Sequence, residues 1–305
     1  MDTNLIYDLI YGIIIIIIIM FLLKKISNNT IQNYINNDIY QFLPSNVNNI
    51  IKNNNNSIIE MKKYNVIFAS TVRNVENFLK TNLENIDKCG QKFNNYLVII
   101  YENDSEDNTR NILLENKKSN YEYIFDNGIT EPRRTMRIAN GRNKILQKVR
   151  ELNVNNLYNY LVVLDLDDVN ISGNFINTID TCFEYSNWDV LTGNQREQYY
   201  DLWALRKKYD MDYDCWRMVT LNYHIPNAQH IFVFDKLKKY EPGELLEVDS
   251  AFSGIAIYKL SSIPDHCNYV GQYEDGGELC EHVEFNRCIK NSGKSIYINT
   301  SFLTD

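Results

Sequence analysis

Two aspartates separated by a single residue are the strongest candidates for chemistry in this sequence. Asp165 and Asp167 follow Tyr160–Leu164, an apolar run with the composition of a buried strand. Carboxylates at positions i and i+2 after such a strand can bind one hard divalent cation, Mg²⁺ or Mn²⁺, whose other ligands are commonly phosphate oxygens and water. Acidic turns after strands are common, so the pair alone is a weak signal.

An acidic stretch also follows an earlier apolar run. Tyr96–Tyr101 leads into the segment Glu-Asn-Asp-Ser-Glu-Asp-Asn-Thr, residues 102–109. This segment is either part of a ligand site or an Asx-rich turn that caps the helix after it, and both roles can coexist.

A group of arginines precedes the aspartate pair. Arg133, Arg137 and Arg142 are spaced so that they can neutralise a diphosphate, and guanidinium groups suit that geometry. The alternative is a solvated basic face of a helix. Of the three, Arg142 is our preferred ligand.

The elements that position these residues follow an α/β pattern. Tyr64–Ser70 is expected to be a strand and Val75–Ile86 a helix, and the strand Tyr96–Tyr101 with its following segment repeats that unit. Two such units in series predict a mostly parallel, doubly wound, Rossmann-like sheet. Its ligand should lie at the carboxyl ends of the strands. We expect one such domain over residues 63–305.

Three later segments add candidate site residues. Aromatic side chains stack on sugar rings, but the aromatic residues of the segment 198–206 can equally belong to the core. A helix and a closing strand, Ser295–Asn299, are expected after the last segment. The candidates are Tyr200, Asp201, Trp203 and Arg206 in the segment 198–206, Gly254 before an apolar strand, and Glu281 with His282 in Cys280–Asn286.

The order of these motifs resembles the GT-A glycosyltransferases, and residues 102–109 are similar to the acidic D-x-S-x-D-x-T loop of the family 2 enzymes. The resemblance implies that Glu102 and Asp104 contact the nucleoside of a nucleotide sugar and that Gly254 borders the donor sugar. The residues that it assigns to donor binding are Ser70, Arg73, Glu102, Asp104, Arg142, Asp165 and Gly254.

The stretch Tyr200-Asp-Leu-Trp-Ala-Leu-Arg206 is similar to the Y-D-x-W-x-x-R segment of the fungal capsule-associated mannosyltransferases, the group of the cryptococcal α-1,3-mannosyltransferase. It lies in the acceptor half of those proteins. The resemblance therefore implies that Tyr200, Asp201, Trp203 and Arg206 bind the acceptor substrate.

Glu281 and His282 occupy the position of the E-D pair that follows the donor site in family 2. The resemblance implies that Glu281 and the metal-binding Asp167 are catalytic, with Glu281 as general base, and that His282 is the third metal ligand after Asp165 and Asp167. A lone histidine is more often structural, and histidine in place of aspartate weakens the assignment of the base. Whether the enzyme retains or inverts the anomeric configuration stays open.

The resulting hypothesis is a metal-dependent transferase that moves a hexose, mannose or a similar sugar, from a nucleotide-diphosphate sugar to a glycan, protein or lipid. The main alternative is a haloacid-dehalogenase-like phosphatase with Asp165 as nucleophile, but two βα units precede the aspartates and that family's later lysine and paired aspartates are not evident. The fingerprint of sugar nucleotidyltransferases is absent after the first strand, and a non-catalytic lectin-like protein would not need the intact aspartate pair.

The first 62 residues differ from the rest. Residues 1–25 are predicted to form a transmembrane anchor, although the apolar stretch Leu9–Leu23 would span only about 22 Å as a helix, against roughly 30 Å of hydrocarbon. A cleaved signal peptide is the alternative. Residues 26–62 are rich in asparagine and predict a stem or linker. Lys24 and Lys25 favour a cytoplasmic catalytic domain, whereas analogy with the family favours a lumenal one.

Composition narrows the partners. The net charge of −8 argues against nucleic acid, because proteins that bind phosphate backbones usually present a basic face. The abundance of Asn, Ile, Lys and Tyr indicates an AT-rich genome, such as that of a large DNA virus or a protist. The six cysteines include no CxxC pair, so no zinc or redox motif is indicated.

Overall fold

The computed structural model describes residues 60–305. The predicted anchor, residues 1–25, and all but the last three residues of the predicted linker lie outside this range. Between Glu60 and Asp305, no helix is both long and apolar enough to cross a membrane.

The described residues alternate between strands and helices over their first hundred positions, as the sequence predicts. The strands are β1 (Asn65–Val72), β2 (Asn95–Asn103), β3 (Tyr121–Asp126), β4 (Tyr160–Leu164), β5 (Val190–Asn194), β6 (Leu245–Glu247), β7 (Ile255–Lys259) and β8 (Ile296–Leu303). The α-helices are α3 (Glu76–Gly90), α4 (Thr109–Glu115), α5 (Arg134–Leu152), α6 (Asn174–Thr178), α7 (Cys215–Leu221), α8 (Ala228–Phe232) and α9 (Glu281–Asn291). Short 3₁₀ segments are η1 (Asp168–Asn170), η2 (Ile179–Glu184), η3 (Phe234–Lys236) and η4 (Leu260–Ser262).

All eight strands form one sheet in the order β3-β2-β1-β4-β7-β5-β8-β6. The block β3-β2-β1-β4 is parallel throughout, with Ala69 of β1 opposite Ile99 of β2 and Val163 of β4. β7 is antiparallel to both β4 and β5, whereas β8 is parallel to β5 and antiparallel to β6. The sheet is therefore mixed, and the expected parallel arrangement holds fully for the four strands on one side.

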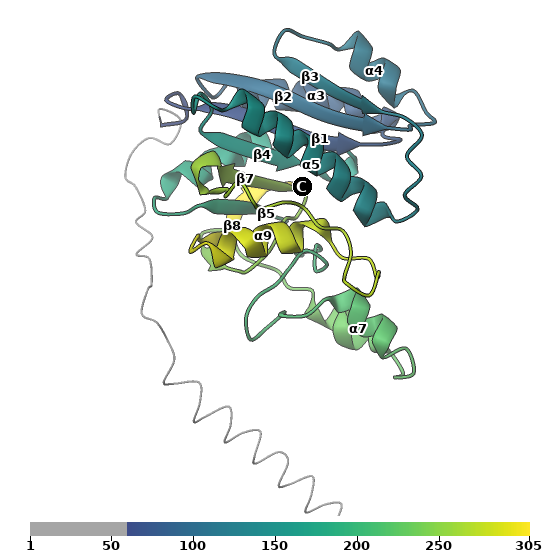
Figure 1. Cartoon of the computed structure of the whole chain (residues 1–305). Helices are drawn as coiled ribbons and strands as arrows, with labels where there is room; N and C mark the ends of the chain where they lie inside the picture. The colour runs from purple at the N-terminus through teal and green to yellow at the C-terminus, as the bar shows by residue number, and fades with distance from the viewer. Residues whose placement is uncertain (1–59) are drawn as a thin grey trace, which may run out of the picture. The chain divides into compact units, whose positions relative to one another are not determined.

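Helices cover both faces of the sheet, so the domain has three layers (Figure 1). Alternate residues of each strand point to opposite faces. In β1, Ile67 and Ala69 pack with α5 and α9, while Val66 and Phe68 pack with α3 and α6. The cores on the two faces hold β1, β2 and β4 rigidly, and the polar residues that follow these strands gather at one edge.

Candidate active site

A cavity of about 590 Å³ opens at the carboxyl ends of β1, β2 and β4. This edge is where ligands bind in open α/β sheets. The first turns of α5 and α9 and the loop before β7 complete its wall. The predicted site residues that line it are Arg73, Arg142, Asp165, Asp167, Tyr200, Asp201, Trp203, Glu281 and His282.

The loop after β4 presents the aspartate pair. The backbone N–H of Asp165 donates to the carbonyl oxygen of Gly254 at 3.0 Å, and its own carbonyl accepts from Asn170 Nδ2 at 2.9 Å. The Asp167 side chain caps η1 by accepting from the N–H of Val169 at 3.3 Å. The backbone under both carboxylates is therefore fixed by hydrogen bonds before any ligand binds.

Gly254 acts on the site through Asp165 and does not itself line the cavity. Its φ is +79°, a left-handed conformation that favours glycine, and a Cβ placed there would meet Val169 Cγ1 at 2.8 Å. Its carbonyl also accepts from Asn170 Nδ2 at 2.8 Å. The structure thus gives this residue a part in holding the aspartate loop, and its predicted contact with a donor sugar stays a prediction.

Arg142 joins two elements of the wall. Its Nε donates to Glu281 Oε1 at 3.0 Å and its Nη2 to Asp165 Oδ1 at 3.1 Å, although the residue is only 4% exposed. The guanidinium carbon lies 5.2 Å from the ring centroid of Phe252 and 5.8 Å from that of Tyr269. Within the described residues, Nη1 has no hydrogen-bond partner. A buried cation with an unused donor at the wall of a cavity suits an anionic ligand.

The pKa values of Asp165 and Asp167 are raised, so these two carboxylates take up a proton more easily than exposed ones do. Burial raises the pKa of Asp165 from 3.8 to about 7; Arg142 opposes this shift, and the charges of Asp167 and Glu281 add to it. Burial is also the largest cause of the raised pKa of Asp167. Since several carboxylates repel one another here, a bound cation would stabilise their ionised forms.

His282 is buried in the same wall, on the first turn of α9. Its ring stacks on Phe252, with centroids 3.7 Å apart and planes at 19°. Burial, with the charge of Arg142, lowers its pKa well below the ordinary value, so the imidazole is neutral at pH 7. Among residues 60–305, neither ring nitrogen has a hydrogen-bond partner; Nε2 lies 3.6 Å from Glu281 Oε1. A neutral buried imidazole with free nitrogens has the chemistry of a metal ligand.

The predicted metal ligands share the cavity without forming a compact cluster. In the part of the chain that the structure describes, three ligand atoms lie within 4.8 Å of one another only in the group His266, Cys267 and Cys288. The ligand atoms of Asp165, Asp167 and His282 do not all lie within 4.8 Å of one another. The donor set fits Mn²⁺ or Mg²⁺ by type, with hard oxygens and one imidazole.

The predicted acceptor residues divide between the cavity wall and the core. Tyr200, which is 44% exposed, and Trp203 line the cavity. Arg206 is 2% exposed; its Nη1 donates to the carbonyl of Trp203 at 2.9 Å and its Nη2 lies 3.4 Å from Asp214 Oδ2. Arg206 is therefore a buried residue that holds the backbone of Trp203, and it does not line the cavity.

Asp201 and Asp214 fix the segment that carries Trp203. Asp201 accepts from the backbone N–H groups of Ala204 and Ser253, at 3.3 and 3.0 Å. Asp214 Oδ2 accepts from Trp203 Nε1 at 3.0 Å, and this carboxylate was not singled out in the sequence. A side chain eleven positions away gives no local signal of such a contact.

The three remaining predicted residues do not line the cavity. Glu102 is fully buried, pairs with Arg110 and accepts from the N–H of Ser105 at 2.9 Å. Asp104 accepts from the N–H groups at positions 128 and 129, at 2.6 and 3.0 Å. Ser70 is 1% exposed on β1. In the acidic stretch, Asp107 Oδ1 accepts from the N–H of Thr109 at 3.0 Å, as in an Asx turn, but the N-cap residue Asn108 makes no side-chain cap hydrogen bond to α4. The contact of this stretch with a nucleoside stays a prediction.

Several lining residues were not among the predicted ligands. They include Arg134 on α5 and Phe252 before β7, whereas Arg137, one of the three arginines that the sequence suggested for a diphosphate, also lines the cavity. The sequence shows several arginines near the start of α5. Which of them faces the cavity depends on the position of each around the helix axis, and this could not be read from the sequence. Arg133 instead pairs with Glu131.

No family model matches the sequence, and no curated protein does. Solved structures of similar outline include the mannosyltransferase PcManGT from Pyrobaculum calidifontis in complex with GDP-Man and Mn²⁺, at 11% identity and a TM-score of 0.42. That match covers 76% of this chain and 54% of the other, so this chain spans about half the length of that enzyme.

Two further structures are similar at the same level. Glucosyl-3-phosphoglycerate synthase from Mycobacterium tuberculosis, in complex with UDP, is 10% identical, with 77% of this chain and 69% of that chain covered and a TM-score of 0.40. TarS residues 1–349 from S. aureus are 14% identical, with 79% and 58% covered and a TM-score of 0.41. Similarity at this level assigns no family to the chain.

Proposed function

We propose that this protein is a metal-dependent glycosyltransferase that moves a hexose, mannose or a similar sugar, from a nucleotide-diphosphate sugar to an acceptor. One observation carries the proposal: Asp165, Asp167, Arg142 and the unpaired imidazole of His282 line a single cavity at the carboxyl ends of β1, β2 and β4. Carboxylates for a cation beside arginines for phosphate are what a diphosphate leaving group requires.

The residues would divide the work as follows. Asp165, Asp167 and His282 would hold Mn²⁺ or Mg²⁺, and the cation would stabilise the charge that builds on the departing diphosphate. The ligand atoms of these three side chains do not all lie within 4.8 Å of one another, so the side chains would have to move closer together to hold one cation. Arg134 and Arg137 line the cavity on the side of α5 and would contact phosphate oxygens.

Tyr200 and Trp203 are aromatic residues that line the cavity. We assign them to the acceptor sugar, lipid or peptide. Glu281, whose Oε1 is held by Arg142, is the proposed base that deprotonates the acceptor hydroxyl. We further propose that residues 1–25 anchor the chain in a membrane. The Cys267–Cys288 disulfide favours a catalytic domain that faces an oxidising compartment.

Ligand-dependent stability tests the proposal. The full chain in detergent is heated with UDP, GDP or CMP, with Mn²⁺ or with chelator, and the unfolding midpoint is recorded. We expect one nucleoside diphosphate to stabilise the protein only when Mn²⁺ is present, and Asp167→Asn to abolish that effect. Asp168→Asn is the matched control, because this neighbouring side chain is exposed and does not line the cavity.

The same experiment distinguishes the proposed glycosyltransferase from the alternative, a phosphatase. If no nucleotide stabilises the protein and it hydrolyses p-nitrophenyl phosphate with Mg²⁺, the glycosyltransferase proposal fails and the phosphatase with Asp165 as nucleophile replaces it. Two observations support the glycosyltransferase over the phosphatase: Asp165 accepts a hydrogen bond from Arg142, and the described lining residues include no lysine.

A further inference from the structure

One face of α9 runs from the cavity to a disulfide. His282, Phe285 and Cys288 are spaced three residues apart, so Phe285 is a neighbour of both other residues on the helix surface. His282 lies at the cavity end, and Cys288 is bonded to Cys267 in the loop before α9. The separation of six positions from His282 to Cys288 corresponds to about 9 Å of helix.

Residues of the loop before α9 contact each of these three side chains. Cys267 carries the disulfide, and the ring of Tyr269 stacks on Phe285 with centroids 4.1 Å apart and planes at 20°. Tyr269 also meets His282 edge to face at 5.6 Å. The guanidinium of Arg142 lies against the same tyrosine.

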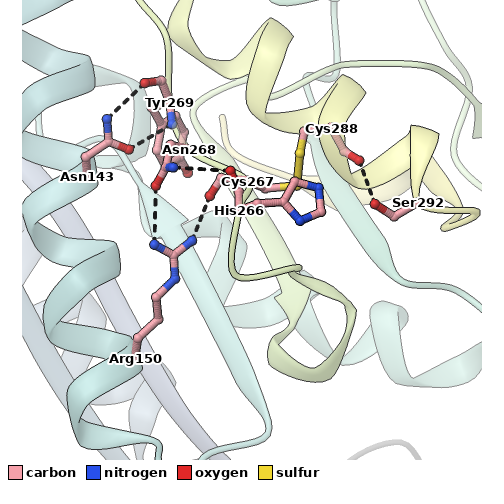
Figure 2. The surroundings of a disulfide bond; sticks show 8 residues. All are labelled: Asn143, Arg150, His266, Cys267, Asn268, Tyr269, Cys288 and Ser292. Carbon is pink, nitrogen blue, oxygen red and sulfur yellow. Dashed lines mark hydrogen bonds between the residues drawn. A yellow bond between two sulfur atoms is a disulfide. The ribbon is translucent and has the colours of Figure 1, made fainter.

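The loop is tied to α5 as well (Figure 2). Asn143 Nδ2 donates to the carbonyl of Tyr269 at 2.9 Å, and Asn143 Oδ1 accepts from the N–H of Tyr269 at 2.8 Å. Arg150 donates to the carbonyl of Cys267 at 2.7 Å and to Asn268 Oδ1 at 3.2 Å. Tyr269 is therefore held by α5 on one side and by α9 on the other.

His282 needs such support. A histidine that binds a metal is usually oriented by a hydrogen bond from its second ring nitrogen. In residues 60–305, neither nitrogen of His282 has such a partner. The contacts that fix the plane of its ring are the aromatic ones, with Phe252 on its face and Tyr269 at 83° to it.

We infer that Tyr269 and the Cys267–Cys288 disulfide are positioning residues that hold His282 and Arg142 at the wall of the cavity, where they contribute to the binding of a cation and a diphosphate. This inference rests on the proposed function. The disulfide keeps the loop against α9, the loop places Tyr269, and Tyr269 orients the two cavity residues. Reduction of the disulfide should weaken binding at the cavity without unfolding the domain.

The test compares full-length wild type in detergent, before and after reduction by a phosphine, with three variants. Cys267→Ser/Cys288→Ser removes the disulfide, Tyr269→Leu removes the aromatic ring, and Tyr269→Phe keeps it. Electron paramagnetic resonance of Mn²⁺, alone and with UDP or GDP, gives the affinity. Hydrogen exchange of residues 280–284 reports on the first turn of α9. All measurements are made well below each variant's unfolding temperature.

We expect Tyr269→Phe to bind Mn²⁺ like oxidised wild type, and Tyr269→Leu, the double serine variant and reduced wild type to bind it roughly tenfold more weakly or worse. Exchange at residues 280–284 should rise in those three. The phosphine should not change the double serine variant further. These differences isolate the role of the ring and of the disulfide from general destabilisation.

Two results would overturn the inference: wild-type Mn²⁺ affinity in Tyr269→Leu and in the double serine variant, or unchanged exchange at residues 280–284 when the disulfide is absent. If oxidised wild type binds neither Mn²⁺ nor nucleotide, the proposed function fails. Hydrogen exchange then decides alone whether the loop holds α9, so the two failures are distinguishable.

Discussion

Arg142 donates to Asp165 at 3.1 Å and to Glu281 at 3.0 Å, so one guanidinium group connects the loop after β4 to the first turn of α9. The two carboxylates belong to segments more than a hundred residues apart. A single buried side chain therefore bridges the two carboxylates.

Replacement of this arginine should destabilise the protein. Arg142→Met leaves Glu281 buried without its cationic partner, and we expect a loss of about 3 kcal/mol or more in the free energy of unfolding. Urea denaturation measures it. Arg287→Met is the control: its pair with Glu284 is partly exposed at 3.2 Å, and its loss should cost less than about 1 kcal/mol. Equal losses in both variants would contradict a structural role for the buried pair.

The stability of the metal-free protein should depend on pH through Asp165. Its pKa is raised from 3.8 to about 7, so between these values the folded state binds more protons than the unfolded state. The contribution of this group is fully present below pH 3.8 and is lost as pH rises through about 7. Wild type should thus lose stability relative to Asp165→Asn between pH 5 and pH 8, measured by thermal unfolding with chelator. A stability difference that does not change with pH would show that Asp165 titrates normally.

Gly254→Ala should damage the site through the aspartate loop. The new Cβ would lie 2.8 Å from Val169 Cγ1, in a backbone with φ of +79°. Gly276→Ala is the control that separates the steric contact from the backbone strain. Its φ is +84°, but no heavy atom lies within 4 Å of the new Cβ. Both should lose about 1 kcal/mol or more from the positive φ. We expect Gly254→Ala to lose more and also to lose Mn²⁺-dependent nucleotide stabilisation. If Gly276→Ala loses that stabilisation too, the effect is not local.

Replacement of Asp214 should destabilise the segment that carries Trp203. Its Oδ2 accepts from Trp203 Nε1 and from the hydroxyl of Tyr273, both at 3.0 Å, and lies 3.4 Å from Arg206 Nη2. Asp214→Asn removes the charge that balances the buried Arg206, and should cost about 3 kcal/mol in chemical denaturation. The control is Asp275→Asn on the pair with Arg217, whose carboxylate is 59% exposed. It should cost less than about 1 kcal/mol, and a comparable loss would argue against the buried network.

Much of the framework could be read from the sequence. Leu79, Leu83 and Ile86 are buried along one face of α3, as their helical spacing predicts. The run Tyr160–Leu164 is a fully buried strand that ends at the aspartate loop. The direction of β7 could not be read, because an apolar run has the same pattern whichever way the strand runs in the sheet.

The site was less accessible to such reasoning. Residues that follow strand ends were placed well, since the sheet itself brings Arg73, Asp165 and Asp167 to one edge. Glu102 and Arg206 bear the same charges as cavity residues, but Arg110 and Asp214 satisfy them inside the fold. Which charged group finds an internal partner depends on contacts between distant segments, and spacing along the chain does not contain that information.

β8 lies between β5 and β6, both of which precede it in the chain. During synthesis, the edge of β5 that faces β8, and β6, which pairs with no other described strand, therefore have unpaired N–H and C=O groups until residues 296–303 emerge from the ribosome. Exposed strand edges of this kind are sites of aggregation. A premature stop after α9 should thus yield an insoluble product instead of a partly active one, and this half of the sheet folds only after translation has passed β8.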